Sequence, residues 1–225
     1  MTKILQLKIS LNDVRPAVWR RFLVKDSINF QDLHNVIQIV MGWESYHLFE
    51  FKIGNVVITC EEEGFNPAEA SFKKIFDSPE FMKMLEKQDL SKDTVILDTD
   101  KVNEIIKNNE KNKPKNNFSM ETKINELIKS AGQKFSYHYD FGDNWKHTIN
   151  LEKILEKDDS KNYSECIAGE RACPPEDCGG VSGYEKLLRI LKNKNHKEHK
   201  EMLEWLGGEF DSENFNINKT NKTLF

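Results

Sequence analysis

The sequence predicts an α+β fold, in which a mostly antiparallel sheet built from hairpins carries helices on one face. Two observations favour this class. Several short stretches alternate apolar and polar residues, as strands with one buried face do. Other stretches repeat apolar residues at three- and four-residue spacing and end at glycine, which is typical of amphipathic helices. No repeat or clear linker divides the 225 residues, so we expect one domain over 1–225, with a weakly patterned, insert-like region at 61–131.

The N-terminal part has the clearest alternation and one well-marked helix. Asn29 is a good N-cap, and the apolar residues after it recur at helical spacing until Gly42 offers a left-handed stop. Alternation predicts two hairpins around this helix. Their expected strands are 3–11 with 17–25, and 46–53 with 56–60.

The C-terminal part predicts one further hairpin and three helices. Ser119 is expected to cap a helix that reaches Gly132, and residues 166–183 are expected to be a loop because Cys, Pro and Gly dominate there. The expected hairpin is 134–141 with 145–153, and the last two helices carry Tyr184 to Leu191 and His199 to Leu206.

The apolar pattern of the C-terminal hairpin suggests its register. A three-residue loop of Gly142, Asp143 and Asn144 would pair Tyr139 with His147 and place Asp140 opposite Lys146. A two-residue turn would pair Tyr139 with Lys146 instead. We prefer the first register, because Asn144 then takes a left-handed position that it tolerates.

Composition limits the class of partner. The chain has 33 Lys and Arg against 37 Asp and Glu, a net charge of −4, so nucleic acid would bind only through a local basic patch. No apolar run is long enough to span a bilayer, and the first ten residues alternate like a strand rather than a signal peptide. We therefore expect a cytoplasmic protein without a membrane partner, and the sequence leaves its oligomeric state open.

The densest polar locus is HYDFGDNWKH, residues 138–147. Asp140, Asp143 and His147 surround one tight turn, and carboxylates beside an imidazole suit a divalent cation or a general acid and base. A purely structural role is the alternative. Asp143 would then bond its own turn, His147 would lie in the core and Asp140 would pair with Lys146.

The second polar locus is CPPEDCGG, residues 173–180. Its prolines and glycines hold Glu176 and Asp177 in a stiff, exposed loop, which makes them candidate metal ligands or catalytic groups. Alternatively, one of them caps the next helix or pairs with Arg171. The thiols of this region are candidate zinc ligands, although their spacing lacks the two-residue knuckle of most zinc sites: Cys166, Cys173 and Cys178.

A third group combines aromatic, basic and histidine side chains. Trp19, Arg20 and Arg21, with His34 nearby, form a candidate anion or base-stacking platform, although an indole in the middle of a strand is more often part of the core. The candidate ligand-binding residues from the whole sequence are Arg20, Trp43, His47, Tyr139 and Trp145.

Long motifs in a fixed order give the chain a specific resemblance. RPAVWRR, LHNVIQIVMGW and HLFEF occur near the N-terminus, and YHYDFGDNWKH and CIAGERACPPEDCGGVSGY follow later. This pattern resembles the plasmid pRiA4b ORF-3-like family. The resemblance implies an α+β domain of bacteria and archaea, often carried by plasmids or insertion elements, with no established catalytic residues. Some relatives carry a resolvase label, but this acidic chain shows no helix-turn-helix with a basic recognition helix, so that label suggests no mechanism.

Two functions are consistent with these features. The first is a non-catalytic binding or accessory protein of mobile genetic elements, whose surface combines the Asp140 turn with the 174–180 loop. The second is a metal-dependent hydrolase or nuclease, in which Asp140, Asp143, Glu176 and Asp177 bind the metal and His147 or His138 assists a water. The sequence requires no cofactor but allows a divalent metal. Both functions require the two acidic turns to share one pocket.

Overall fold

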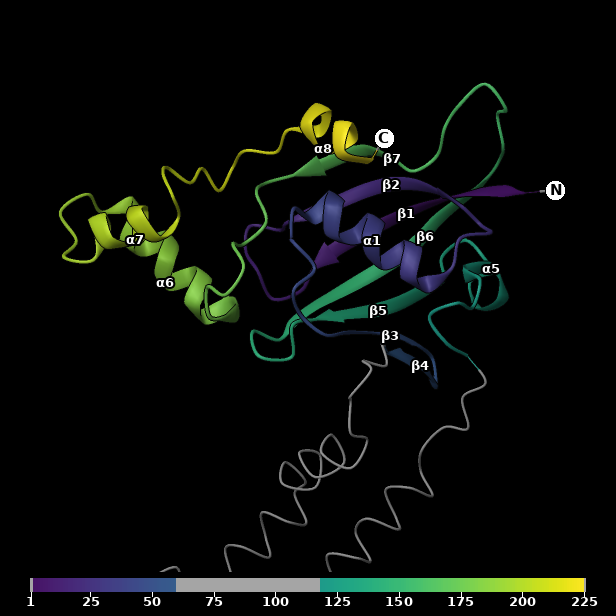
Figure 1. Ribbon diagram of the computed structural model, residues 1–225, viewed down its shortest axis with the longest axis horizontal. Coiled ribbons are helices and arrows are strands. Elements are labelled where there is room, and N and C mark those ends of the chain that lie inside the picture. The colour runs from purple at the N-terminus through teal and green to yellow at the C-terminus, as the bar shows by residue number, and fades with distance from the viewer. Residues whose placement is uncertain (1, 60–117, 225) are drawn as a thin grey trace, which may run out of the picture. The chain divides into compact units, whose positions relative to one another are not determined.

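The computed structural model describes residues 2–59 and 118–224, and residues 60–117 lie outside the described part. The described strands form one seven-stranded sheet in the order β4-β3-β5-β6-β1-β2-β7, with antiparallel pairing throughout (Figure 1). These strands are β1 (Lys3–Leu11), β2 (Trp19–Lys25), β3 (Phe49–Ile53), β4 (Val56–Thr59), β5 (Lys134–Tyr139), β6 (Trp145–Glu156) and β7 (Glu165–Glu170). The helices within the same residues are α1 (Phe30–Met41), α5 (Ile124–Leu127), α6 (Gly180–Lys192), α7 (His199–Trp205) and α8 (Ile217–Leu224).

The core lies between one face of the sheet and α1. Leu5, Leu7 and Ile9 of β1 are buried on this face, and the polar residues between them point to the other face. Helix α1 lies across the sheet and buries the apolar stripe that the sequence predicted (Figure 1). Asn29 caps its first turn by accepting a hydrogen bond from Asp32 N at 2.7 Å, and Gly42 ends it with φ 94°. The predicted α+β class is confirmed.

The C-terminal hairpin has the predicted faces but another register. Tyr139 pairs with Trp145 and Tyr137 with His147, so the predicted pairing of Tyr139 with His147 is wrong by two residues. The strand ends early because Asp140 turns away with φ 54° and its Oδ1 accepts a hydrogen bond from Gly142 N at 2.8 Å. His138, rather than Asp140, lies opposite Lys146. Asn144 takes the predicted left-handed conformation, with φ 60°.

Two other predicted elements need correction. Residues 166–170, which we expected at the start of a loop, belong to the edge strand β7 (Glu165–Glu170) beside β2. Alternation did not reveal this strand, because Cys166 is its one fully buried residue. The helix expected after Ser119 is shortened to the single turn of α5, because Lys123 is still extended and Ile128 already leaves the helix. None of the described helices is long and apolar enough to cross a membrane.

Candidate metal centre

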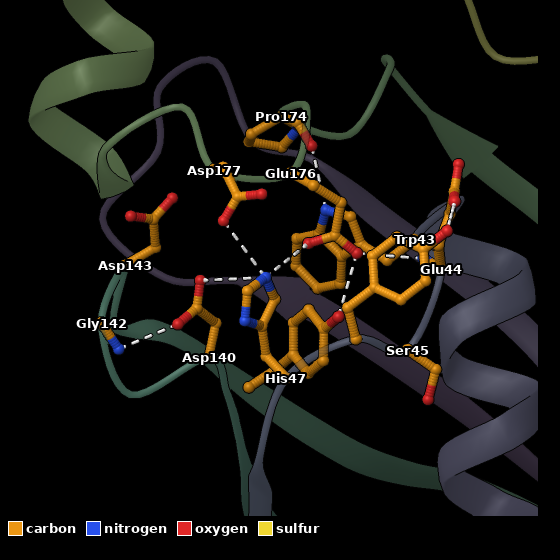
Figure 2. Close-up of polar contacts among 12 residues, drawn as sticks. Trp43, Glu44, Ser45, His47, Asp140, Gly142, Asp143, Pro174, Glu176 and Asp177 are labelled. Carbon is orange, nitrogen blue, oxygen red and sulfur yellow. Dashed lines mark hydrogen bonds and ion pairs between the residues drawn. The ribbon is translucent and has the colours of Figure 1, made fainter.

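Three loops meet at one end of β5. Residues 43–47 connect α1 to β3, residues 140–144 connect β5 to β6, and residues 171–179 connect β7 to α6. Figure 2 shows Asp140, Glu176 and Asp177 pointing toward the ring of His47 from different sides. The two acidic turns of the sequence are therefore neighbours in space, and a histidine from a third segment lies between them.

The imidazole Nε2 of His47 is the centre of this group. It lies 3.2 Å from Asp177 Oδ1, 3.8 Å from Asp140 Oδ2 and 3.8 Å from Glu176 Oε2. The ligand atoms of His47, Asp140 and Asp177 all lie within 4.8 Å of one another, which is close enough to share one metal ion. We refer to His47, Asp140, Glu176 and Asp177 as the carboxylate–histidine cluster.

Two carboxylates of the cluster are fixed through one oxygen and leave the other free. Asp140 uses Oδ1 to close its own turn. Glu176 Oε1 accepts hydrogen bonds from the Tyr139 hydroxyl and from Glu44 N, both at 2.9 Å. The remaining oxygens, Asp140 Oδ2 and Glu176 Oε2, face His47 Nε2. Carboxylates that bind metals are commonly oriented in this way, by hydrogen bonds to the oxygen that does not face the metal.

Two buried atoms at the centre of the cluster lack hydrogen-bond partners. His47 Nε2 and Glu176 Oε2 are both shielded from solvent and unpaired within the described residues. Asp140 is also withdrawn from solvent, with only 8% of its side chain exposed. Because buried polar atoms are nearly always hydrogen-bonded, these two atoms have unused bonding capacity at the point where the three carboxylates converge, and the contact of His47 Nε2 with Asp177 Oδ1 at 3.2 Å is an ion pair only if the ring is protonated.

The charge of the cluster favours a cation. Asp143, in the turn that follows Asp140, adds a fourth carboxylate next to the loop of Glu176 and Asp177, where it accepts a hydrogen bond from Gly179 N. Among the described residues, His47 is the only basic side chain within ion-pair distance of the three carboxylates of the cluster. Like charges at this range repel one another unless a cation separates them. One nitrogen and three carboxylate oxygens suit a divalent ion of the Mn²⁺, Fe²⁺ or Zn²⁺ type.

The two acidic turns are docked directly on each other. Asp143 Oδ2 accepts a hydrogen bond from Gly179 N at 3.0 Å, immediately before α6. A Cβ atom added to Gly180 would lie 2.5 Å from the Asp143 carbonyl oxygen, so only glycine permits this contact. Asp143 therefore supports the start of α6, and the expectation that Glu176 or Asp177 caps this helix is wrong.

Buried polar side chains of α1 hold the loop that carries His47. His34 contacts the Tyr137 hydroxyl through Nδ1 at 2.8 Å and Ser45 Oγ through Nε2 at 2.6 Å. Gln38 accepts a hydrogen bond from Ser45 N at 3.0 Å. Burial lowers the pKa of His34 to about 4, so its ring is neutral at pH 7. These bonds, rather than regular secondary structure, fix the loop.

Two stacked aromatic side chains pack next to the cluster. Trp43 stacks on Tyr139 with ring centroids 5.0 Å apart and donates its Nε1 hydrogen to the Pro174 carbonyl at 2.9 Å. Burial and the neighbouring Glu176 raise the pKa of Tyr139, so its hydroxyl stays protonated and donates to that carboxylate. Trp43 and Tyr139 are therefore supports of the cluster, with 6% and 0% of their surfaces exposed.

Other predicted site residues lie away from the cluster. His147 is fully buried, its Nδ1 lies 3.2 Å from the Tyr137 carbonyl oxygen, and burial lowers its pKa to about 3. It does not reach the carboxylates, nor does His138, which pairs with Glu50 at 3.7 Å. Trp145 is fully buried in the core. These three side chains therefore lie outside the carboxylate–histidine cluster.

The predicted platform of Trp19, Arg20, Arg21 and His34 forms only in part: the Arg21 guanidinium lies 5.1 Å from the centre of the Trp19 ring, but Arg20 and His34 are buried elsewhere. Arg20 points away from Trp19 because neighbouring strand residues point to opposite faces. Arg20 is 1% exposed, and its guanidinium donates to four backbone carbonyls. These belong to Trp19, Val40, Glu170 and Arg171. Arg20 therefore joins β2, α1 and β7, while half-buried Trp19 lies on the other face of the sheet.

The three candidate thiols are free, and no set of three possible metal ligands within the described part of the chain includes them. Burial raises the pKa of Cys166 to about 11 and that of Cys178 to about 12, and it raises the pKa of Cys173 as well. These thiols are therefore protonated at neutral pH in the metal-free protein.

His47 is the member of the cluster that sequence reasoning did not connect to the carboxylates. It was a candidate ligand-binding residue as a member of the aromatic, basic and histidine group, and alternation separately placed it on the same strand face as Phe49 and Phe51. That pattern gives the face but not the end of the strand, and Phe49 is the first strand residue. No local signal shows that His47 meets two turns from the C-terminal half.

Comparison with known proteins gives three concordant matches. The profile of the family described as "Plasmid pRiA4b ORF-3-like protein" matches residues 3–219. "Uncharacterized protein y4hQ" of Sinorhizobium fredii is 27% identical over 227 residues, which cover 100% of this chain and 92% of that protein. A crystal structure of a protein of unknown function from Methanosarcina mazei Go1 is 31% identical with a TM-score of 0.69, and the alignment covers 97% of each chain. Since the family profile spans nearly the whole sequence, this chain belongs to the plasmid pRiA4b ORF-3-like protein family.

Proposed function

We propose that this protein is a divalent-cation-binding module, with His47, Asp140, Glu176 and Asp177 as the ligands. One observation carries the proposal: carboxylate oxygens from two separate loops converge on a buried Nε2 of a third loop that has no hydrogen-bond partner among the described residues. A cation at this point would pair both buried atoms and offset the repulsion between the carboxylates.

Charge favours binding over catalysis at this centre. Three carboxylates carry more negative charge than one divalent ion offsets, so the ion would acidify a bound water less than it does in a site of neutral histidines. The function supported best is therefore an accessory module in which the ion joins three loops. The plasmid named in the family's description supports a role among mobile genetic elements.

A metal-dependent hydrolase is the second candidate, and one observation favours it. Asp177 is 70% exposed and the His47 side chain is 27% exposed, so the cluster has a side open to solvent. A six-coordinate ion with four protein ligands would keep water on that side. Turnover of a phosphodiester or ester by the Mn²⁺-loaded protein would favour the hydrolase, and metal binding without turnover would favour the module.

Calorimetric titration with Mn²⁺ and Zn²⁺ tests the proposal. We expect one ion per chain, and we expect Asp140→Asn and Glu176→Gln each to weaken the affinity at least tenfold, because each removes a charged ligand. Glu201→Gln is the control, since Glu201 is an exposed residue of α7 outside the cluster. Absence of binding, or equal affinities in all four proteins, would overturn the proposal.

A further inference from the structure

The face of the sheet opposite α1 carries an ordered polar surface. We call it the open face and define it by the outward side chains of β5, β6, β1 and β2. These side chains are half-buried or exposed, in contrast to their buried neighbours on the core face. A solvated second face is common in antiparallel sheets, but here the side chains are sorted by type.

One line of this face, the cationic row, crosses four neighbouring strands. Lys134 of β5 pairs with Asn150 of β6, Asn150 with Lys8 of β1, and Lys8 with Arg21 of β2. Directly paired residues point to the same face, and neighbouring strands lie about 4.8 Å apart. The row therefore presents three cations and one amide over a span of about 14 Å.

The next line, the hydroxyl row, runs parallel to it. Each member pairs with the next across neighbouring strands of the sheet, in the order β3, β5, β6, β1 and β2. They are Lys52, Ser136, Thr148, Ser10 and Trp19. Together the two rows hold four basic and no acidic side chains, in a chain whose net charge is −4. The nearby carboxylates flank the rows at Glu50, Glu152 and Glu170.

Trp19 gives the open face an aromatic surface next to the cations. Lys8 Nζ lies 4.5 Å from the centre of the Trp19 ring system, and the Arg21 guanidinium lies 5.1 Å from it. Arg21 is also held by Glu152, at 2.6 Å, so Lys8 and Lys134 are the more available charges. Aromatic rings beside basic groups are the pairing that binds stacked bases and phosphates together.

A shallow depression in the same face contains an unsatisfied acceptor. Asn150 Oδ1 is buried and has no hydrogen-bond partner within the described residues. It lies in the cationic row, between Lys134 and Lys8. The lining residues are Gln6, Arg21, Gly132, Asn150, Glu152 and Lys153. An amide oxygen of this kind accepts hydrogen bonds from a base N–H, such as N3–H of an unpaired thymine, whereas the neighbouring lysines bind phosphate.

We propose that the open face binds single-stranded nucleic acid, with Lys8 and Lys134 on phosphates and Trp19 stacked on a base. A sheet face with one half-buried ring beside a basic row suits splayed single strands, because their bases are free to stack on the ring where the mobile Lys8 side chain moves from it to a phosphate. The hydroxyl row adds sequence-independent contacts to the backbone. This site is separate from the carboxylate–histidine cluster and does not depend on its metal.

Fluorescence anisotropy of a labelled oligothymidylate of about 20 nucleotides tests this proposal on the full chain. We expect binding at about 50 mM salt that weakens about sevenfold at about 200 mM, as two phosphate contacts on a single strand require. The double variant Lys8→Gln, Lys134→Gln should lose about tenfold in affinity or more. Its matched control, Lys194→Gln with Lys200→Gln, removes two exposed lysines elsewhere and should bind as the unaltered protein does.

Stacking is tested with a second matched pair. Trp19→Leu should weaken binding about tenfold, whereas Trp205→Leu removes an indole that is 48% exposed on α7 and should have little effect. Three results would overturn the proposal: no binding at low salt, equal losses in variant and control, or tighter binding of a duplex of the same length. Thermal unfolding of each variant shows that it is folded.

Discussion

His34 and His147 show how single residues of the aromatic core depend on protonation. His34 stacks on Phe49 with ring centroids 3.5 Å apart, and His147 packs edge-on against Trp43 at 5.2 Å. Burial lowers the pKa of His34 to about 4 and that of His147 to about 3. Both rings are therefore neutral in the folded protein, and their protonation requires the core to open.

Stability is expected to fall as the pH falls from 7 to 4.5. An unfolded histidine binds its proton near pH 6.5, whereas these two stay neutral when folded, so the unfolded state binds more protons over this range. Each histidine should contribute a loss of about 2–3 kcal/mol at pH 4.5. Urea unfolding at several pH values measures it. His34→Gln should show a shallower pH dependence than the unaltered protein and the control His196→Gln, and equal dependences would contradict this explanation.

At the scale of elements, the docking of two turns determines the geometry of the cluster. The β5–β6 turn supplies Asp140 and Asp143, and the loop before α6 supplies Asp177, Gly179 and Gly180. The bond between Asp143 and Gly179 holds the turns together. Residues outside the ligand set should therefore control cation affinity.

Gly180→Ala is expected to weaken cation binding without removing a ligand. Its Cβ would meet the Asp143 carbonyl oxygen at 2.5 Å and force the turns apart, and φ +66° adds a backbone cost of about 1–2 kcal/mol. Gly207→Ala is the matched control, because φ is +70° there and nothing lies within 4 Å of the added atom. Calorimetry should show a loss of affinity in the first variant only. Equal affinities would mean that the contact between the turns does not position the ligands.

The elements that the sequence predicted well are those with a local signal. Strand β1 and helix α1 have the predicted bounds to within a residue, because alternation and caps mark them directly. The β5–β6 register was wrong because Asp140 ends the pairing through its own side chain. Strand β7 was missed because its pairing with β2 depends on a partner far along the chain.

At the scale of the whole molecule, the distribution of charge matters more than its sum. The net charge of −4 is the sum of the acidic carboxylate–histidine cluster, the basic rows of the open face and the rest of the chain. Both functions considered from the sequence require the acidic turns to lie together, and in the structure Asp140 and Asp177 both lie within 4 Å of the same histidine nitrogen. The central position of His47 could be found only from the three-dimensional structure, because the three loops that form the cluster come from distant parts of the chain.

The most direct test of the central claim is anomalous diffraction from crystals of the full chain soaked in Mn²⁺. We expect one strong peak about 2.0–2.3 Å from His47 Nε2, with oxygens of Asp140, Glu176 and Asp177 around it at similar distances. A crystal with manganese bound elsewhere and no peak among these four residues would contradict the assignment of a cation site.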